Sequence, residues 1–74
     1  MTDIEKTIIK AIELDKLVRI IYESDKGFTE RTVRPIKLEN EELYAYCYLR
    51  RSRRKFKLSG ILSAVPQILE KDNG

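Results

Sequence analysis

The side chains best suited to bind a ligand are concentrated in one short segment. Residues 50–57 read Arg-Arg-Ser-Arg-Arg-Lys-Phe-Lys and carry six positive charges and no negative charge. The rest of the chain is slightly acidic, with a net charge of −2 over residues 1–49 and −1 over residues 58–74, which with +6 gives the overall +3. A local positive field of this kind is typical of a surface that binds an anion, above all a nucleic acid or a nucleotide.

A solubilising surface hairpin is the alternative explanation of this basic run. Eight residues without an acid, in a chain otherwise rich in Glu, argue against it. A guanidinium can also hold a phosphate through two hydrogen bonds, so we favour anion binding. A membrane surface suits the segment less well, because Phe56 is its only apolar residue. The residues expected to hold phosphates chiefly through charge are Arg50, Arg51, Arg53, Lys55 and Lys57.

Arg54 has a different environment from its basic neighbours. Side chains alternate between the two faces of a strand, so Arg54 should share a face with Phe56 and Leu58. An unpaired guanidinium on a buried face is unfavourable, so Arg54 must meet either an internal acid, such as Glu30, or an external anion. We favour the anion. Arg31 and Arg34 lie on opposite faces of the second expected strand, so at most one of them can easily join Arg54.

Tyrosines form the second chemically distinctive group. Tyr44, Tyr46 and Tyr48 alternate with small apolar residues, so they share one strand face, where they could stack on nucleobases. They could equally cover a neighbouring element, with their hydroxyls at the rim. We favour that second explanation for Tyr44 and Tyr48 and leave both open for Tyr46. Tyr22 likewise either contacts a ligand or completes the core.

Catalytic and metal chemistry find little support. Histidine is absent, which removes the commonest general base and metal ligand. Cys47, the only cysteine, has no base to activate it and too few companions for zinc, so we expect a small buried hydrophobe. Glycine-rich phosphate loops are also missing. The sequence therefore predicts no enzymatic activity, no metal and no cofactor.

The composition also limits the setting. A chain of 74 residues corresponds to one small domain. A lone cysteine and the lack of a signal-peptide pattern are typical of a reducing, cytoplasmic location. No apolar run approaches the roughly 18 residues of a membrane span. We therefore expect a single cytoplasmic domain over residues 1–74 with no membrane partner.

A helix is predicted at about residues 3–15. Thr2 and Glu5 have the spacing of a capping box, in which each side chain accepts a hydrogen bond from the other residue's amide. Apolar residues then recur at helical spacing and form one stripe. These residues are Ile4, Ile8, Ala11 and Ile12.

Strands are predicted over about residues 17–69, followed by a polar tail at 70–74. Turns are expected at residues 24–27, where Gly27 tolerates a positive φ, and at 39–41. Pro35 indicates a bulge, bend or edge, and Pro66 lies near an edge. The extended segments begin at Leu17 and otherwise cover residues 28–38, 43–49, 54–58 and 61–69. Since closure removes most exposed edges, we predict a mainly β fold with one N-terminal α-helix and a small five-stranded antiparallel β-barrel.

Five sequence pieces, in order from Ile8 to about Gln67, resemble the WYL domain family. They are Ala11-Ile12 with Val18-x-Ile20-x-Tyr22, Arg31-x-Val33-x-Pro35, Leu43-x-Ala45-Tyr46-Cys47, Arg54-x-Phe56-x-Leu58, and Ile61. Two departures stand out. Glu41 and Glu42 replace the Trp and Tyr that name the family, and Gly60 replaces the arginine usual before the final Ile. The family's winged helix-turn-helix and C-terminal extension are not expected here, so the chain resembles a stand-alone member.

The resemblance implies an Sm-like (SH3-like) barrel that senses ligands in bacterial or phage-related regulators. Its implied ligands are single-stranded RNA or DNA, or nucleotides. Matching positions point to Arg31 and Arg54 as oriented contacts, and to Tyr22 and Tyr46 as residues that pack or stack on the ligand. We therefore predict a ligand-sensing module of transcription regulation. The alternative is a protein-interaction module, either a homodimer or a docking subunit of a larger transcriptional or phage-defence regulator.

Overall fold

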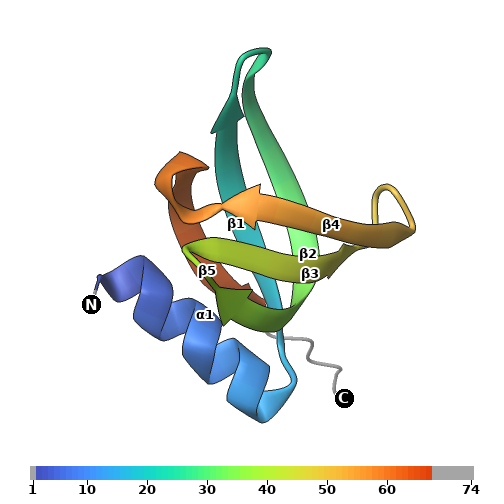
Figure 1. Cartoon of the computed structure of the whole chain (residues 1–74). Helices are drawn as coiled ribbons and strands as arrows, with labels where there is room; N and C mark the ends of the chain where they lie inside the picture. Colours follow the sequence, from blue (N-terminus) through green and yellow to red (C-terminus); the bar gives the residue numbers. More distant parts are fainter. Residues whose placement is uncertain (1, 68–74) are drawn as a thin grey trace.

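The computed structural model describes residues 2–67, in which one α-helix precedes a five-stranded antiparallel sheet (Figure 1). The elements are α1 (Asp3–Leu14), β1 (Leu17–Ser24), β2 (Gly27–Glu39), β3 (Glu42–Cys47), β4 (Ser52–Lys57), the 3₁₀ turn η1 (Leu58–Gly60) and β5 (Ile61–Gln67). The predicted extension of the last strand to Leu69 and the polar tail at 70–74 lie outside the described residues.

Helix α1 begins at the predicted capping box. The Thr2 hydroxyl accepts a hydrogen bond from the Glu5 amide at 3.1 Å, and the Glu5 carboxylate accepts one from the Thr2 amide at 3.0 Å. The helix ends at Asp15, whose φ of 56° is left-handed. Ile8 and Ala11 are its buried residues and pack against the sheet.

The strands follow the order β4-β3-β2-β1-β5, and every neighbouring pair is antiparallel. Gly27 has a φ of 106° in the first hairpin turn, and Asn40 and Glu41 have φ values of 54° and 60° in the second. Strand β2 is shared, because its first half pairs with β1 and its second half with β3. The register shifts between Pro35 and Lys37, which confirms the bulge expected at the proline. The β3–β4 pair consequently crosses the β1–β2 hairpin (Figure 1).

The structure corrects the predicted closed barrel to an open sheet. Strands β4 and β5 are its two edges, and within residues 2–67 no strand pairing joins them. The chain passes between them through η1, and backbone donors at this point have other partners. The Lys57 amide donates to the Tyr22 hydroxyl at 3.3 Å, and the Leu58 amide donates to the Glu41 carbonyl at 3.0 Å. The Sm-like classification implied by the resemblance is not confirmed either.

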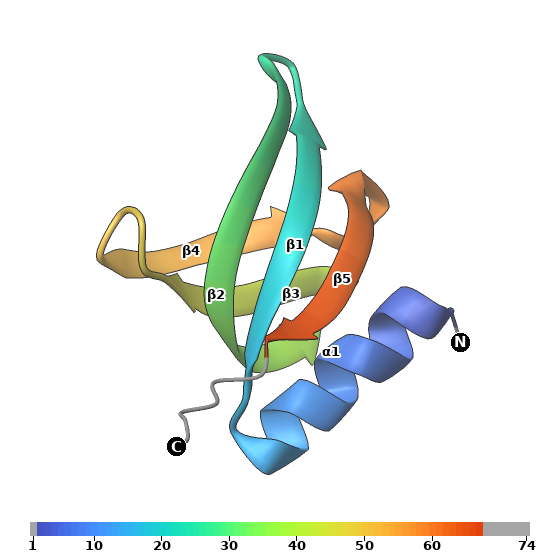
Figure 2. The ribbon, with the colours of Figure 1, turned by 180° about the vertical axis from the view of Figure 1, so that it is seen from behind.

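The core lies on one face of the sheet, here called the inner face. Its fully or almost fully buried side chains come from all five strands: Val18, Ile20, Val33, Leu43, Ala45, Cys47, Phe56 and Ile61. Helix α1 covers one end of this face and packs mainly beside β2 and β5 (Figure 2). Within residues 2–67, α1 does not cover the other end, toward the β1–β2 turn.

Two apolar residues depart from their predicted positions. Leu49 was expected beside Cys47 on the apolar face, but β3 ends at Cys47 and the Leu49 side chain is 66% exposed. The chain turns over residues 48–51, where Arg51 adopts a φ of 55°. Leu58, expected in a strand, begins η1. The turn therefore takes Leu49 out of the alternation, because the pattern persists only while the backbone stays extended.

Candidate anion-binding site

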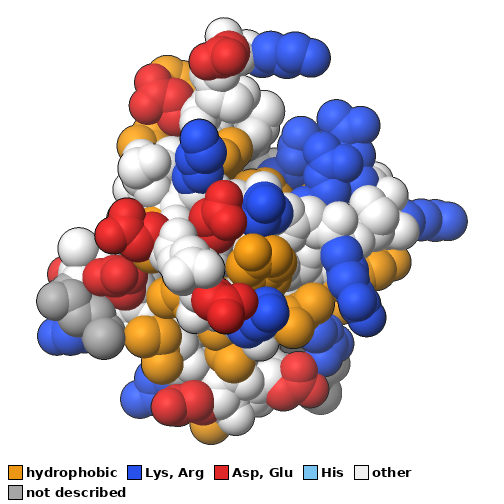
Figure 3. All heavy atoms as spheres, in the orientation of Figure 1, with side chains coloured by type: hydrophobic (Ala, Val, Ile, Leu, Met, Phe, Trp, Pro, Cys, Tyr) orange, Lys and Arg blue, Asp and Glu red, His pale blue; other side chains and the backbone are white. Residues whose placement is uncertain are grey.

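The uncovered end of the inner face forms a cavity of about 260 Å³, which we call the inner cavity. Its lining residues are Tyr22, Ser24, Lys26, Thr29, Arg31, Cys47, Arg50, Arg54, Lys55 and Phe56. Five of these are cationic and none is acidic. In the space-filling view, Lys and Arg side chains gather between the upper part of the β1–β2 hairpin and β4 (Figure 3). The cavity is therefore a concentrated positive site.

Strand register brings these distant residues together. Tyr22 of β1 pairs with Thr29 of β2, and Arg31 lies two residues further along β2 on the same face. Arg54 of β4 pairs with Ala45, which is buried on the inner face. Arg31 and Arg54 therefore approach one cavity from separate strands.

The arginines of the inner cavity lack acidic partners. Arg19 contacts Glu30 at 3.1 Å and Arg34 contacts Asp15 at 2.7 Å, both outside the cavity. Among residues 2–67, no carboxylate lies within 4.0 Å of the guanidinium groups lining the inner cavity. Glu30, the expected internal partner of Arg54, is thus engaged elsewhere. Arg54 is also exposed instead of buried, so its charge faces solvent and is available to an anion.

Tyr22 forms a wall of the inner cavity and also completes the core. Its ring lies edge-to-face against Phe56, with centroids 5.1 Å apart and planes at 75°. Its hydroxyl accepts the hydrogen bond from the Lys57 amide, and its carbonyl accepts one from the Thr29 hydroxyl at 3.4 Å. A half-buried ring held on two sides presents a fixed surface to anything in the cavity.

Gly60 explains why the arginine expected from the resemblance is absent. A Cβ atom at this position would lie 2.8 Å from Cε1 of Tyr22 and 3.0 Å from the Glu23 carbonyl oxygen. Real Cβ atoms do not approach other heavy atoms so closely, and one of the two neighbours is backbone. The space that a side chain at position 60 would need is therefore occupied by Tyr22.

A second cavity of about 440 Å³ lies beside β4, toward the opposite face of the sheet, and we call it the outer cavity. Its lining residues are Ile36, Lys37, Tyr44, Ala45, Arg53, Arg54 and Lys55. The ammonium groups of Lys37 and Lys55 lie 4.9 and 5.9 Å from the centroid of the Tyr44 ring. This cavity therefore combines an aromatic ring with positive charge.

Tyr46 and Tyr48 lie on this outer face and do not line the inner cavity. Their rings meet edge-to-face with centroids 5.0 Å apart. The Tyr48 hydroxyl accepts a hydrogen bond from Nε of Arg34 at 3.1 Å. This bond, followed by the Asp15 carboxylate, raises the pKa of Arg34. The structure thus separates Tyr46 from Tyr22, although sequence reasoning placed them in one site.

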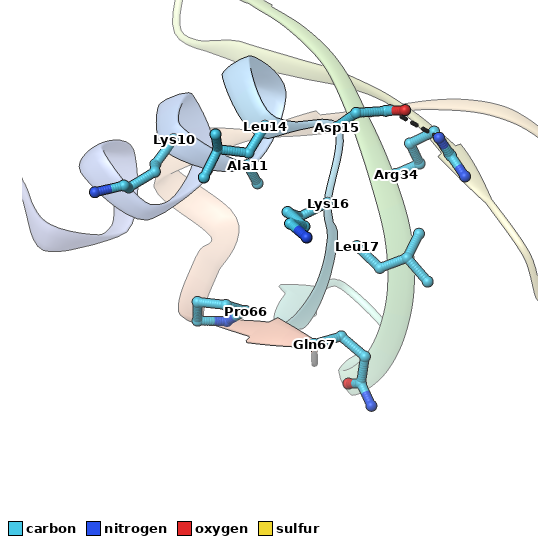
Figure 4. Close-up of a pocket in the computed structure, with 9 residues that line it drawn as sticks. All are labelled: Lys10, Ala11, Leu14, Asp15, Lys16, Leu17, Arg34, Pro66 and Gln67. Atoms are coloured by element: carbon cyan, nitrogen blue, oxygen red, sulfur yellow. Dashed lines mark hydrogen bonds and ion pairs between the residues drawn. The ribbon is translucent and has the colours of Figure 1, made fainter. Parts of the chain in front are cut away.

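A third cavity, of about 400 Å³, lies at the end of α1 and contains none of the predicted site residues (Figure 4). Its lining residues are Lys10, Ala11, Leu14, Asp15, Lys16, Leu17, Arg34, Pro66 and Gln67. The close-up shows the Asp15 carboxylate bonded to Arg34 at its margin. Because its arginine is already paired, this cavity is a poorer anion site than the inner one.

Of the nine predicted site residues, the inner cavity brings together five: Tyr22, Arg31, Arg50, Arg54 and Lys55. Arg53 lines the outer cavity, whereas Tyr46, Arg51 and Lys57 line neither. The other lining residues of the inner cavity were not predicted as site residues: Ser24, Lys26, Thr29, Cys47 and Phe56. Thr29 could have been found, because it alternates with Arg31, but nothing marked Lys26 in its turn. Within the described residues there is no cluster of three metal-ligating side chains, and no helix of the length and apolarity of a membrane span.

Comparisons with known proteins identify the family of this chain. Residues 3–66 match the model of the WYL domain family, so the chain belongs to that family, as its motifs predicted. Among solved structures, it is similar to proteasome accessory factor B/C (PafBC) of Arthrobacter aurescens, with a TM-score of 0.74 and 31% identity. The match covers 84% of this chain and 11% of the PafBC chain. No curated protein matches this sequence.

Proposed function

We propose that this protein is a non-enzymatic regulatory module whose inner cavity captures the phosphate groups of a single-stranded nucleic acid or a nucleotide. The observation that carries the proposal is the meeting of five cationic side chains, without an acid, around one cavity. Like charges brought together at a protein surface repel one another and are most readily explained by an anion that binds among them.

Arg31 and Arg54 have the leading roles in this proposal. They come from separate strands, they lack carboxylate partners among the described residues, and a guanidinium can hold a phosphate with two hydrogen bonds. Lys26, Arg50 and Lys55 add attraction from the rim. Tyr22 supplies the fixed wall against which a sugar or base can pack.

The size of the inner cavity limits what enters it. A volume of about 260 Å³ is below the roughly 300–1,000 Å³ of pockets that enclose a whole drug-sized ligand. A phosphate with part of its sugar is the better match, so the rest of the ligand lies outside. A nucleotide within a longer strand meets this condition.

The wider context supports the same role. Membership of the WYL domain family and likeness to PafBC favour a ligand-responsive part of a bacterial or phage transcription regulator in the cytoplasm. Two features favour binding over catalysis in this proposal. The chain has no histidine, and the Cys47 side chain is buried.

The test is fluorescence anisotropy of labelled single-stranded RNA and DNA, titrated with protein over a salt series. Binding should weaken with a log–log salt slope of about −0.7 for each phosphate contacted. Arg54→Ala should lower affinity about tenfold, as expected for a charge-assisted contact. Arg19→Ala is the matched control, since Arg19 pairs with Glu30 outside the cavity.

The opposite result is equally clear. If neither RNA nor DNA binds at low salt, the nucleic-acid form of the proposal is wrong, and if a free nucleotide does not bind either, the proposed function is wrong. If Arg54→Ala and Arg19→Ala weaken binding equally, the inner cavity is not the binding site. A dimeric mass in that case would favour the alternative of a protein-interaction module, for which β5 offers an open edge with Leu62 and Val65 46% and 48% exposed.

A further inference from the structure

The inner and outer cavities share a wall, and that wall is the edge strand β4. Arg54 and Lys55 contribute to the lining of both cavities. Successive residues of a strand point to opposite faces, so one strand can serve two faces at once. Because β4 is the last strand of the sheet, no further strand separates the two cavities on that side.

The outer cavity has the chemistry of a second nucleic-acid contact. Tyr44 provides an aromatic ring, and stacking of bases on such rings tolerates any sequence. Arg53 has no carboxylate partner among the described residues, so its charge is available to a phosphate. Ile36, 44% exposed in the β2 bulge, adds apolar surface beside the ring.

We propose, building on the proposed function, that a single-stranded nucleic acid bound in the inner cavity continues around the β4 edge and places its next nucleotides in the outer cavity. Arg54 and Lys55 accompany the backbone across the edge. Arg53 then holds a phosphate on the outer face while Tyr44 stacks on a base.

Acidic residues at one end of the outer cavity limit how far the bound nucleic acid can extend. Glu39 contacts Lys37 at 3.0 Å and Glu42 contacts Lys55 at 3.7 Å, and both acids belong to the ends of strands at the β2–β3 turn. Their charge repels a polyanion from that end of the outer cavity. The nucleic acid therefore follows β4 from Arg53 only as far as Tyr44, which pairs with Lys55, and does not extend along the turn.

The experiment compares an oligomer of about three nucleotides, shorter than the roughly 4–16 nucleotides of a small single-strand site, with one of about twelve, which lies within that range. Anisotropy is measured for the wild type and for Arg31→Ala, Arg53→Ala and Tyr44→Leu. Arg19→Ala is the control, because Arg19 is paired with Glu30 and lines neither cavity. Thermal melting of each variant tests whether it is folded. If Tyr44→Leu does not fold, Arg53→Ala still tests the outer cavity.

The expected pattern separates the two cavities. Arg31→Ala weakens both oligomers, whereas Arg53→Ala and Tyr44→Leu weaken only the longer one, by about tenfold each. The proposal is overturned if the longer oligomer binds the outer-cavity variants as tightly as the wild type. It is also overturned if Arg53→Ala weakens the binding of an acidic peptide but not the binding of the longer oligomer. If the short oligomer binds but the longer one makes no contact with the outer cavity, the path is wrong and the proposed function stands. If neither oligomer binds, both the path and the nucleic-acid form of the proposed function are wrong.

Discussion

The two ends of the inner face are built from the same strands but have opposite properties. Under α1 the face is apolar and closed, with Val18, Val33 and Leu43 fully buried. Toward the β1–β2 turn it is cationic and open, and it forms the inner cavity. The change occurs within one strand, because Arg31 and Val33 of β2 lie two residues apart on the same face.

This difference shows how a small sheet divides its tasks. Burial of apolar side chains at the closed end provides the free energy of folding, at about 25 cal/mol for each Å² removed from water. The open end concentrates like charges, which oppose folding but attract an anion. A chain of this size has a small stability margin, so the closed end must offset the repulsion at the open end.

The largest expected effect comes from breaking the closed end. Leu43 is fully buried on β3, so Leu43→Ala should lower the free energy of unfolding by about 2–5 kcal/mol. Urea denaturation, monitored by circular dichroism, measures the loss in the free energy of unfolding. Leu62→Ala, at a position 46% exposed on β5, is the control and should change stability by less than about 1 kcal/mol. Equal losses would show that Leu43 is not in a packed core.

A smaller effect is expected at the junction of the two ends. Gly60→Ala places a methyl group against the Tyr22 ring and the Glu23 carbonyl, and overpacking of this kind costs about 1–3 kcal/mol. In a Tyr22→Leu background the loss should shrink but not vanish, because the carbonyl remains. Ser59→Ala, in the same 3₁₀ turn, should be nearly neutral. A neutral Gly60→Ala would mean that Tyr22 can move aside freely.

The smallest effect on stability is expected at the open end. Arg54 is exposed and has no acidic partner among the described residues, so Arg54→Ala should change the free energy of unfolding by no more than about 0.5 kcal/mol. The same variant should lose nucleic-acid affinity, which sharpens the contrast between the two ends. Chemical denaturation at two salt concentrations tests this. A loss above about 1 kcal/mol in the free energy of unfolding would show that Arg54 contributes to the stability of the fold.

Local signals in the sequence predicted much of this architecture. The Thr2–Glu5 capping box starts α1, and the bulge follows Pro35. Alternation along residues 43–47 predicted that Cys47 is buried while the tyrosines lie on the other face. These features depend on residues a few positions apart, so a single sequence contains what is needed to find them.

Which residues line the inner cavity depends on contacts between strands that are distant in sequence, and a local sequence pattern does not contain these contacts. Alternation already puts Tyr46 opposite Cys47, but only the pairing of Arg54 with the buried Ala45 shows that Arg54 reaches the inner cavity while Tyr46 lines neither the inner nor the outer one. The open sheet was missed for the same reason. Whether β4 pairs with β5 is decided by the path of η1 and by the hydrogen bond between Lys57 and Tyr22, which are far apart in sequence.

Strand β4 has one further consequence. Phe56 is its only buried side chain, and its other five positions are exposed. Substitutions at those positions can therefore alter what the two cavities recognise while the packing of the domain is preserved. A six-residue segment that is nearly independent of the core is a ready starting point for the evolution of new ligand preferences, and for engineering them by exchange of this segment alone.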